Sequence, residues 1–300
     1  MEKVARANPK LQFALIDAVV TLPNVQSILF KEHEGSFLVG MLAAMASKTG
    51  KVGFIGGMDI PLIRKFGCGY AQGVKAVNPD ATIILNMTGT TPAAWNDPVK
   101  GAELAKGQKA QGADVIYAAA GGTGVGVLQA AADEGILSIG VDSNQNYMHP
   151  GKVLTSMLKR VDNAVYEAFK EGENLTAGIN VMGLANDGVG YAMDENNASL
   201  VSAEMQAAVD EAAAVALAPD GEDAGHSGHG GEVAEREGLG GIEEVGPELR
   251  DIDMVAIALE DGEVRRTAGA HDEARAELRR ANPQRPQLGR IGRFSHPGPP

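Results

Sequence analysis

The chain has 300 residues, 44% of them hydrophobic, and a formal net charge of -13 at pH 7. This length suffices for one large core or two smaller ones, which permits a two-lobed α/β protein. The negative charge and the lack of a dense Lys and Arg stripe exclude nucleic acid as a partner, because clustered cations are what grip a phosphate backbone.

The single cysteine, Cys68, excludes an internal disulfide and a thiolate zinc cage. It falls in a helical pattern and is interpreted as a structural thiol. No apolar run approaches the ~20 residues that span a bilayer. Residues 1–10 also lack the apolar segment of a signal peptide, so the chain as given is expected to remain cytoplasmic.

Short apolar runs of strand length alternate with helical patterns through the first two hundred residues. The expected strands are residues 12–16, 25–30, 51–57, 81–87, 114–120, 137–141 and 152–158. The expected helices are residues 35–47, 61–77, 97–112 and 123–135. The third helix has Asp97 placed to cap it and Pro98 at its first position. Such alternation predicts parallel sheets that are covered by helices on both faces.

The chain changes character near residue 217. Residues 1–216 contain thirteen Lys and three Arg, whereas residues 217–300 contain no Lys and ten Arg. The later part is so poor in large apolar side chains that most of it is expected to be disordered, with one strand or helix within residues 249–266. His226 and His229 have a metal-ligand spacing, but no further ligand completes a site, so no metal is expected.

Polar residues and glycines follow the expected strands at their carboxyl ends. They are Asp17, Asp59, Trp95, Asn96, Gly121, Gly122 and Asp142. In an open parallel sheet this edge is where ligands bind, because the loops diverge there and helix N-termini point free N–H groups into the crevice. The edge is therefore the candidate site.

Each candidate also has a structural interpretation. Asp17 and Asp142 could each simply cap or close a turn. Lys159 could simply be a solvent-exposed charge at the start of a helix. Trp95 is suited to a core, but it lies in a polar, proline-flanked loop. That setting favours an exposed ring on which a flat ligand stacks, a contact that contributes ~1–3 kcal/mol for a base.

The glycine-rich stretch after residue 120 raises the alternative of a dinucleotide-binding oxidoreductase. Such a site requires G-x-G-x-x-G. Here the glycines are at positions 121, 122, 124 and 126, which leaves Val127 where the last glycine belongs. This unit has no His, Tyr-x-x-x-Lys pair or Cys–His pair that could take part in hydride transfer. No cofactor and no enzymatic activity are therefore expected.

Long blocks of the sequence resemble the basic membrane protein family of substrate-binding lipoproteins, also called purine nucleoside receptor A-like proteins. The blocks are residues 32–44, 51–75, 95–101, 114–131, 139–145 and 154–169. The resemblance implies a type I periplasmic-binding-protein fold, with two Rossmann-like lobes and a nucleoside held between them for an ABC importer. It also implies a periplasmic or cell-surface location, a lipoprotein anchor and a permease partner.

The resemblance assigns roles to individual residues. Asp17 looks like the acid that takes ribose hydroxyls, and Trp95 matches an aromatic position that stacks on the base. Gly121 or Gly122 matches a glycine turn against which the ligand lies. Asp142 looks like the acid that reads base N–H groups, and Lys159 like the cation beside it.

The resemblance also defines what the chain is expected to lack. Family members begin about a hundred residues earlier, so the first lobe is expected to be incomplete. The expected organisation is a first-lobe remnant at 1–56, a second lobe at 57–180, a return segment with a helix at 181–216, and an unrelated tail at 217–300. The expected function is solute binding for a purine nucleoside importer. The alternatives are the oxidoreductase and a fragment without function.

Overall fold

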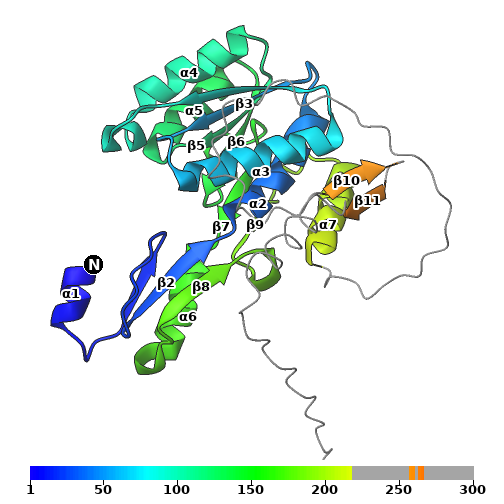
Figure 1. The fold of residues 1–300 in the computed structure, drawn as a ribbon. Helices are drawn as coiled ribbons and strands as arrows, with labels where there is room; N and C mark the ends of the chain where they lie inside the picture. Colours follow the sequence, from blue (N-terminus) through cyan, green and yellow to red (C-terminus); the bar gives the residue numbers. More distant parts are fainter. Residues whose placement is uncertain (218–256, 261–262, 267–300) are drawn as a thin grey trace, which may run out of the picture.

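The computed structural model describes residues 1–217, 257–260 and 263–266, and these residues form a larger and a smaller sheet together with a two-stranded pair (Figure 1). The helices are α1 (Glu2–Ala7), α2 (Glu32–Ala46), α3 (Pro61–Val77), α4 (Pro98–Ala110), α5 (Gly122–Asp133), α6 (Val161–Glu171) and α7 (Ala203–Leu217). The strands are β1 (Phe13–Ile16), β2 (Val25–Phe30), β3 (Lys51–Gly56), β4 (Thr82–Met87), β5 (Val115–Ala119), β6 (Leu137–Asp142), β7 (Val153–Lys159), β8 (Gly178–Met182), β9 (Val189–Tyr191), β10 (Ile257–Glu260) and β11 (Glu263–Arg266).

The larger sheet has the strand order β4-β3-β5-β6-β7-β9, and only β9 runs antiparallel to its neighbour. α2 and α3 cover one face of this sheet, and α4 and α5 cover the other (Figure 1). The central strand β5 is buried at every position, as a parallel strand covered on both faces must be. We call this sheet and α2–α5 the larger lobe.

α2 and α3 pack closely because glycines line their contact. A Cβ atom at Gly40 would lie 2.3 Å from the Tyr70 carbonyl oxygen. A Cβ atom at Gly69 would lie 2.3 Å from the carbonyl oxygen of His33, next to the first residue of α2. The two helices can therefore approach this closely only because Gly40 and Gly69 have no side chain. This contact brings the N-terminus of α2 against the first turns of α3.

The smaller sheet has the order β1-β2-β8, and all three strands are parallel. α6 lies over one face, and we call this sheet and α6 the smaller lobe. A cavity of about 480 Å³ lies between them. Its lining is mainly apolar, with Ile16 and Ile28 on the sheet and Phe169 on the helix.

The chain passes between the lobes at three points that lie side by side. Lys31 leads from β2 to α2, and Arg160 leads from β7 to α6. These two residues have similar backbone angles, φ -90° and ψ 65° for the first and φ -80° and ψ 62° for the second. The third crossing joins β8 to β9. Hydrogen bonds of 2.8 Å connect the crossings, from Lys31 N–H to Met182 O and from Arg160 N–H to Gly188 O.

The expected two-lobed α/β architecture is confirmed, but the lobe boundaries differ from those expected. β3 pairs with β4 and β5, so residues 51–56 belong to the larger sheet and not to a first-lobe remnant. The chain enters the larger lobe after Lys31, because α2 packs on α3. The chain returns to the smaller lobe after Arg160, so α6 and β8 (Gly178–Met182) belong to the smaller lobe, although α6 and the start of β8 lie within the expected second lobe 57–180.

Most of the expected disordered tail lies outside the described residues, as do His226 and His229. Within it, the structure describes β10 and β11, which form an antiparallel pair beside α7. No helix among the described residues combines the length and the apolar character needed to cross a membrane.

Candidate ligand-binding site

The residues expected at the binding edge lie at the carboxyl ends of neighbouring strands. Gly121 follows β5, Asp142 is the last residue of β6, and Lys159 is the last residue of β7. These three strands are adjacent in the sheet, and neighbouring strands lie about 4.8 Å apart. Trp95 ends a 3-10 turn, Pro92–Trp95, that follows the outer strand β4. The structure thus brings these residues to one edge of the larger sheet.

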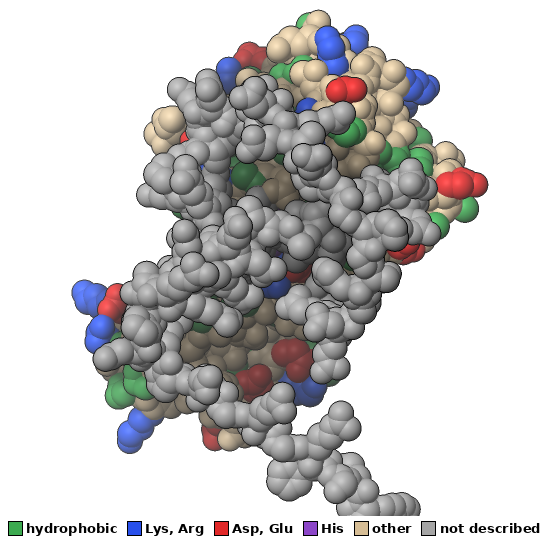
Figure 2. Space-filling view, turned by 45° about the vertical axis from the view of Figure 1, so that its right-hand side comes forward, with side chains coloured by type: hydrophobic (Ala, Val, Ile, Leu, Met, Phe, Trp, Pro, Cys, Tyr) green, Lys and Arg blue, Asp and Glu red, His purple; other side chains and the backbone are tan. Residues whose placement is uncertain are grey.

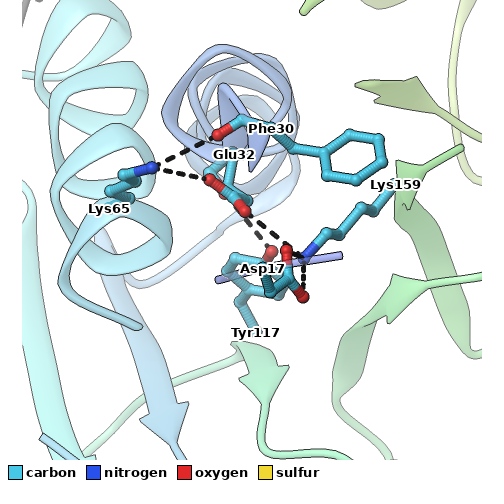
Figure 3. Close-up of polar contacts among 7 residues, drawn as sticks. Asp17, Phe30, Glu32, Lys65, Tyr117 and Lys159 are labelled. Carbon is cyan, nitrogen blue, oxygen red and sulfur yellow. Dashed lines mark hydrogen bonds and ion pairs between the residues drawn. The ribbon is translucent and has the colours of Figure 1, made fainter. Parts of the chain in front are cut away.

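Asp17 joins this edge from the smaller lobe through an ion pair. Both of its carboxylate oxygens lie 2.6 Å from Nζ of Lys159 (Figure 3). The Lys159 side chain is only 5% exposed, whereas that of Asp17 is 31% exposed. The aromatic ring of Phe30 lies under the ammonium, with 5.1 Å between Nζ and the ring centroid. The interpretation of Lys159 as a solvated helix-start charge is therefore wrong.

Glu32, the first residue of α2, lies behind this ion pair and is completely buried. Its Oε1 atom lies 3.3 Å from Nζ of Lys159, and its Oε2 atom lies 3.3 Å from Nζ of Lys65 on α3. Lys65 also donates to the carbonyl oxygen of Phe30 at 3.3 Å (Figure 3). Burial raises the pKa of the Glu32 carboxyl above its usual range, and the two lysines oppose that rise.

Asp142 faces the same ammonium from β6. The residue keeps solvent-exposed surface, yet the surrounding protein removes enough water to raise the pKa of its carboxyl above the usual range. The Lys159 charge lowers this pKa, and the Asp17 charge raises it. Asp17 and Asp142 also share a left-handed backbone, with φ of 63° and 66°. Strain of this kind collects at functional sites, which supports the choice of these two acids.

Trp95 lies against the glycine turns after β3 and β5. A Cβ atom at Gly57 would meet the indole ring at 2.0 Å, so the ring packs closely against that backbone. A Cβ atom at Gly121 would lie 3.3 Å from the Trp95 carbonyl oxygen, and one at Gly122 would lie 3.1 Å from Oδ1 of Asn96. Trp95 is half-buried. One side of the ring is therefore supported by protein, and the remainder is accessible.

The glycine-rich stretch is used for packing rather than for an open phosphate cradle. Gly121 has φ of 55° and precedes α5. A Cβ atom at Gly126 would lie 1.8 Å from the Pro98 carbonyl oxygen, so this glycine lets α5 approach α4. Thr123 donates to the carbonyl oxygen of Ala94 at 2.7 Å, which ties the Trp95 loop to the same helix. These contacts weigh against the dinucleotide interpretation.

Sequence reasoning did not identify Glu32, Lys65 or Tyr117 as members of this cluster. The buried Tyr117 hydroxyl lies 3.3 Å from the Ser36 hydroxyl on α2, just below Glu32 (Figure 3). Glu32 follows an apolar strand with only Lys31 between them, which is a weaker form of the signal that pointed to Asp142. It lay outside the expected helix at 35–47, however, and was not singled out.

Charged side chains of both signs are interspersed at the surface. On the face in Figure 2, Lys and Arg as well as Asp and Glu side chains are visible among the described residues.

Comparison with known proteins shows which family the sequence matches. The family described as Bmp, ABC transporter substrate-binding protein PnrA-like, matches residues 1–215. A CD4+ T-cell-stimulating antigen of Listeria monocytogenes is 36% identical over 233 residues, which cover 70% of this chain and 63% of the antigen. The ABC transporter nucleoside-binding protein BmpA of Lactococcus lactis subsp. cremoris is 33% identical over 228 residues, covering 69% of this chain and 64% of that protein.

A solved structure with the same fold is also similar in sequence. The ABC transporter solute-binding protein of Aeropyrum pernix K1 is 34% identical with a TM-score of 0.59, and the match covers 74% of this chain and 62% of that one. The chain therefore spans under two thirds of the length of these relatives.

Proposed function

This chain belongs to the PnrA-like family of ABC transporter substrate-binding proteins, and we propose that it binds a purine nucleoside between its two lobes for delivery to an importer. The observation that carries the proposal is the Lys159–Asp17 ion pair, which joins the two lobes at the edge that also holds Trp95 and Asp142. A relative with 33% identity is named a nucleoside-binding protein. The proposed partner is the permease of an ABC importer.

Each proposed contact matches one part of a nucleoside. The carboxylate of Asp17 accepts hydrogen bonds from ribose hydroxyls, and charge-assisted bonds of this kind contribute about 1.5–3 kcal/mol each. The Trp95 ring, supported by the backbone at Gly57, stacks on the base. Asp142 accepts from base N–H groups, and Lys159 lies between the two acids. The backbone at Gly121 and Gly122 forms the floor beside the base.

The charge of the cluster favours an uncharged nucleoside over a nucleotide. Three carboxyls (Asp17, Glu32, Asp142) and two ammonium groups (Lys65, Lys159) leave a formal charge of minus one when all are ionised. A phosphate would enter this cluster without a free cation to pair with it, at a cost in desolvation. Sugar hydroxyls and base N–H groups instead supply the donors that carboxylates accept. The proposal therefore involves binding and release, with no catalytic residue.

A thermal-shift and calorimetric titration of the full chain tests this function. Inosine, guanosine and adenosine are compared with NAD at equal concentrations. At a hundredfold excess over Kd, a ligand of the native state stabilises by about 2.7 kcal/mol, and that corresponds to a rise in Tm of roughly 5–10 °C for a domain of this size. We expect this rise with at least one nucleoside and none with NAD.

Two results would contradict the proposal. Stabilisation by NAD alone would support the oxidoreductase alternative. A melting curve without a cooperative transition, with every nucleoside present, would support the fragment without function.

Substitution of the indole provides a more local test. Trp95→Ala is expected to weaken nucleoside binding by about 1–3 kcal/mol, because the base loses its stacking surface. The measurement is calorimetric titration below the Tm of both proteins, since the ring also packs on Gly57. Tyr166→Ala is the control, because this aromatic residue is exposed on α6 away from the site. Equal affinity of Trp95→Ala and the wild type would remove Trp95 from the site.

A further inference from the structure

Glu32 makes no direct ligand contact in the proposed function, although it occupies the centre of the charged cluster. Its side chain is 1% exposed, so it offers almost no surface to a ligand bound at this edge of the sheet. Among the described residues, no donor is aligned to hydrogen-bond Oε1, and the contact of this oxygen is the 3.3 Å ion pair with Lys159. A buried carboxylate placed in this way requires an explanation.

The cluster divides between the lobes in an unequal way. Glu32 on α2, Lys65 on α3 and Lys159 on β7 all belong to the larger lobe. Asp17, after β1, is the partner that comes from the smaller lobe. Of the acids in ion-pair contact with Lys159, Glu32 therefore moves with it and Asp17 moves with the opposite lobe, while Asp142 faces the ammonium from β6 without an ion-pair contact of its own in the described part of the chain.

We propose that Glu32 is a positioning residue, the fixed counter-ion that holds the Lys159 ammonium in the ligand site while Asp17 exchanges between Lys159 and the ligand. This inference rests on the proposed function. In the structure both oxygens of Asp17 are occupied by Lys159 at 2.6 Å. A ligand that takes hydrogen bonds from Asp17 must weaken that contact.

The physical reason is the cost of an unpaired buried charge. An ammonium as enclosed as that of Lys159 is strongly unfavourable without a counter-ion. With Glu32 in place, the ammonium keeps one carboxylate while Asp17 turns to the ligand. Without Glu32, the Lys159–Asp17 ion pair becomes stronger, because Lys159 has lost its other ion-pair partner. The ligand must then break this stronger ion pair to reach Asp17.

Lys65 completes the arrangement by fixing Glu32 itself. It contacts Oε2 of Glu32 and the carbonyl oxygen of Phe30, each at 3.3 Å. The Glu32 carboxylate is thereby held so that its other oxygen faces Lys159. The Phe30 ring limits the movement of Lys159 on its far side. The positions of both charged atoms are thus set before any ligand arrives.

The first test measures inosine affinity of the full chain by calorimetry. Glu32→Gln keeps the size of the side chain and removes its charge. We expect affinity to fall about ten- to a hundredfold, the loss that corresponds to one charge-assisted contact. Glu103→Gln is the matched control, because it removes an exposed Glu–Lys ion pair on α4. The control is expected to leave affinity unchanged.

A double-mutant cycle separates positioning from a general structural effect. If Glu32 acts through Lys159, Glu32→Gln has little further effect on inosine affinity in a Lys159→Gln background. Additive losses would overturn the proposal. Lys65→Met gives a second variant in case the Lys159 variant does not fold. It is expected to weaken binding in the same direction, and unchanged affinity would count against the fixed orientation of Glu32.

A ligand-free measurement keeps this inference distinct from the proposed function. In protein labelled with 15N-lysine, the Nζ signal that disappears in Lys159→Gln belongs to Lys159. We expect this signal to shift in Glu32→Gln and to stay in place in Glu103→Gln. An unchanged signal would overturn the counter-ion role. If the signal shifts but the wild-type chain binds none of the three nucleosides, the counter-ion role is supported and the proposed function fails.

Discussion

The Lys159→Met variant is expected to lose about 3–5 kcal/mol of unfolding free energy at pH 7, the cost of removing one partner from a buried ion pair. Met retains much of the apolar stem that packs in the interior. The acids at 2.6 Å and 3.3 Å, Asp17 and Glu32, lose their shared cation. Urea denaturation followed by circular dichroism gives the free energy.

This deficit has a defined pH dependence. The raised pKa values of Glu32 and Asp142 mean that the native state binds these protons more tightly than the unfolded state. Their stabilising effect is present below the unfolded pKa and is lost as pH rises through the native pKa. Lys159 lowers both pKa values, so its removal raises them further. The deficit is therefore largest at pH 7 and shrinks toward pH 5.

Two variants check the cause of this loss. Lys159→Met combined with Glu32→Gln is expected to recover part of the stability, because a buried charge is removed along with its partner. Lys100→Met removes an exposed ion pair, 3.5 Å long, and is expected to change stability by under about 0.5 kcal/mol. A deficit that grows on acidification would show that the acids around Lys159 are not its cause.

Gly69→Ala is expected to destabilise the chain by a net amount of up to about 2 kcal/mol, because the new Cβ would lie 2.3 Å from the His33 carbonyl oxygen. Overpacking of this kind typically costs about 1–3 kcal/mol and occasionally more, and the backbone atoms it meets have little freedom to move. The better helix propensity of Ala offsets about 1 kcal/mol. Lys65 lies one helical turn before Gly69, and Glu32 lies next to His33. Pushing α3 away from α2 would therefore also separate Lys65 from Glu32.

Gly107→Ala on α4 is the matched control. No atom lies within 4 Å of a Cβ placed there, so only the gain in helix propensity remains. We expect a stabilisation of up to about 1 kcal/mol. Both variants are measured by thermal and urea unfolding. If Gly69→Ala were as stable as Gly107→Ala, close approach of α2 and α3 would not depend on glycine.

The order of elements could be predicted from the sequence, because it depends on local periodicity. The expected helix at 61–77 coincides with α3, and the expected strand at 25–30 coincides with β2. The lobe boundary could not be predicted, since β3 is an apolar run that fits either sheet. Pairing with β4 and β5 decides its place, and no local pattern encodes that pairing.

The candidate site was predictable only in part for the same reason. Acids that follow apolar strands could be identified individually, as Asp17 and Asp142 were. Their shared cation is separated from Asp17 by 142 positions in the sequence. The burial of Glu32 depends on the close contact of two helices, which in turn depends on glycines. These are properties of packing, and a sequence pattern does not contain them.

The matching backbone angles at Lys31 and Arg160 have a mechanical consequence. Each residue stands directly before a helix that belongs to the lobe the chain is entering, and the two are joined through neighbouring backbone hydrogen bonds to the third crossing. Equal torsional changes at both would turn the three-stranded sheet as one rigid flap about a common axis. Asp17 would move with that sheet, whereas Lys65, Lys159 and Glu32 would remain with the larger lobe, so the movement would separate the Asp17 carboxylate from the Lys159 ammonium.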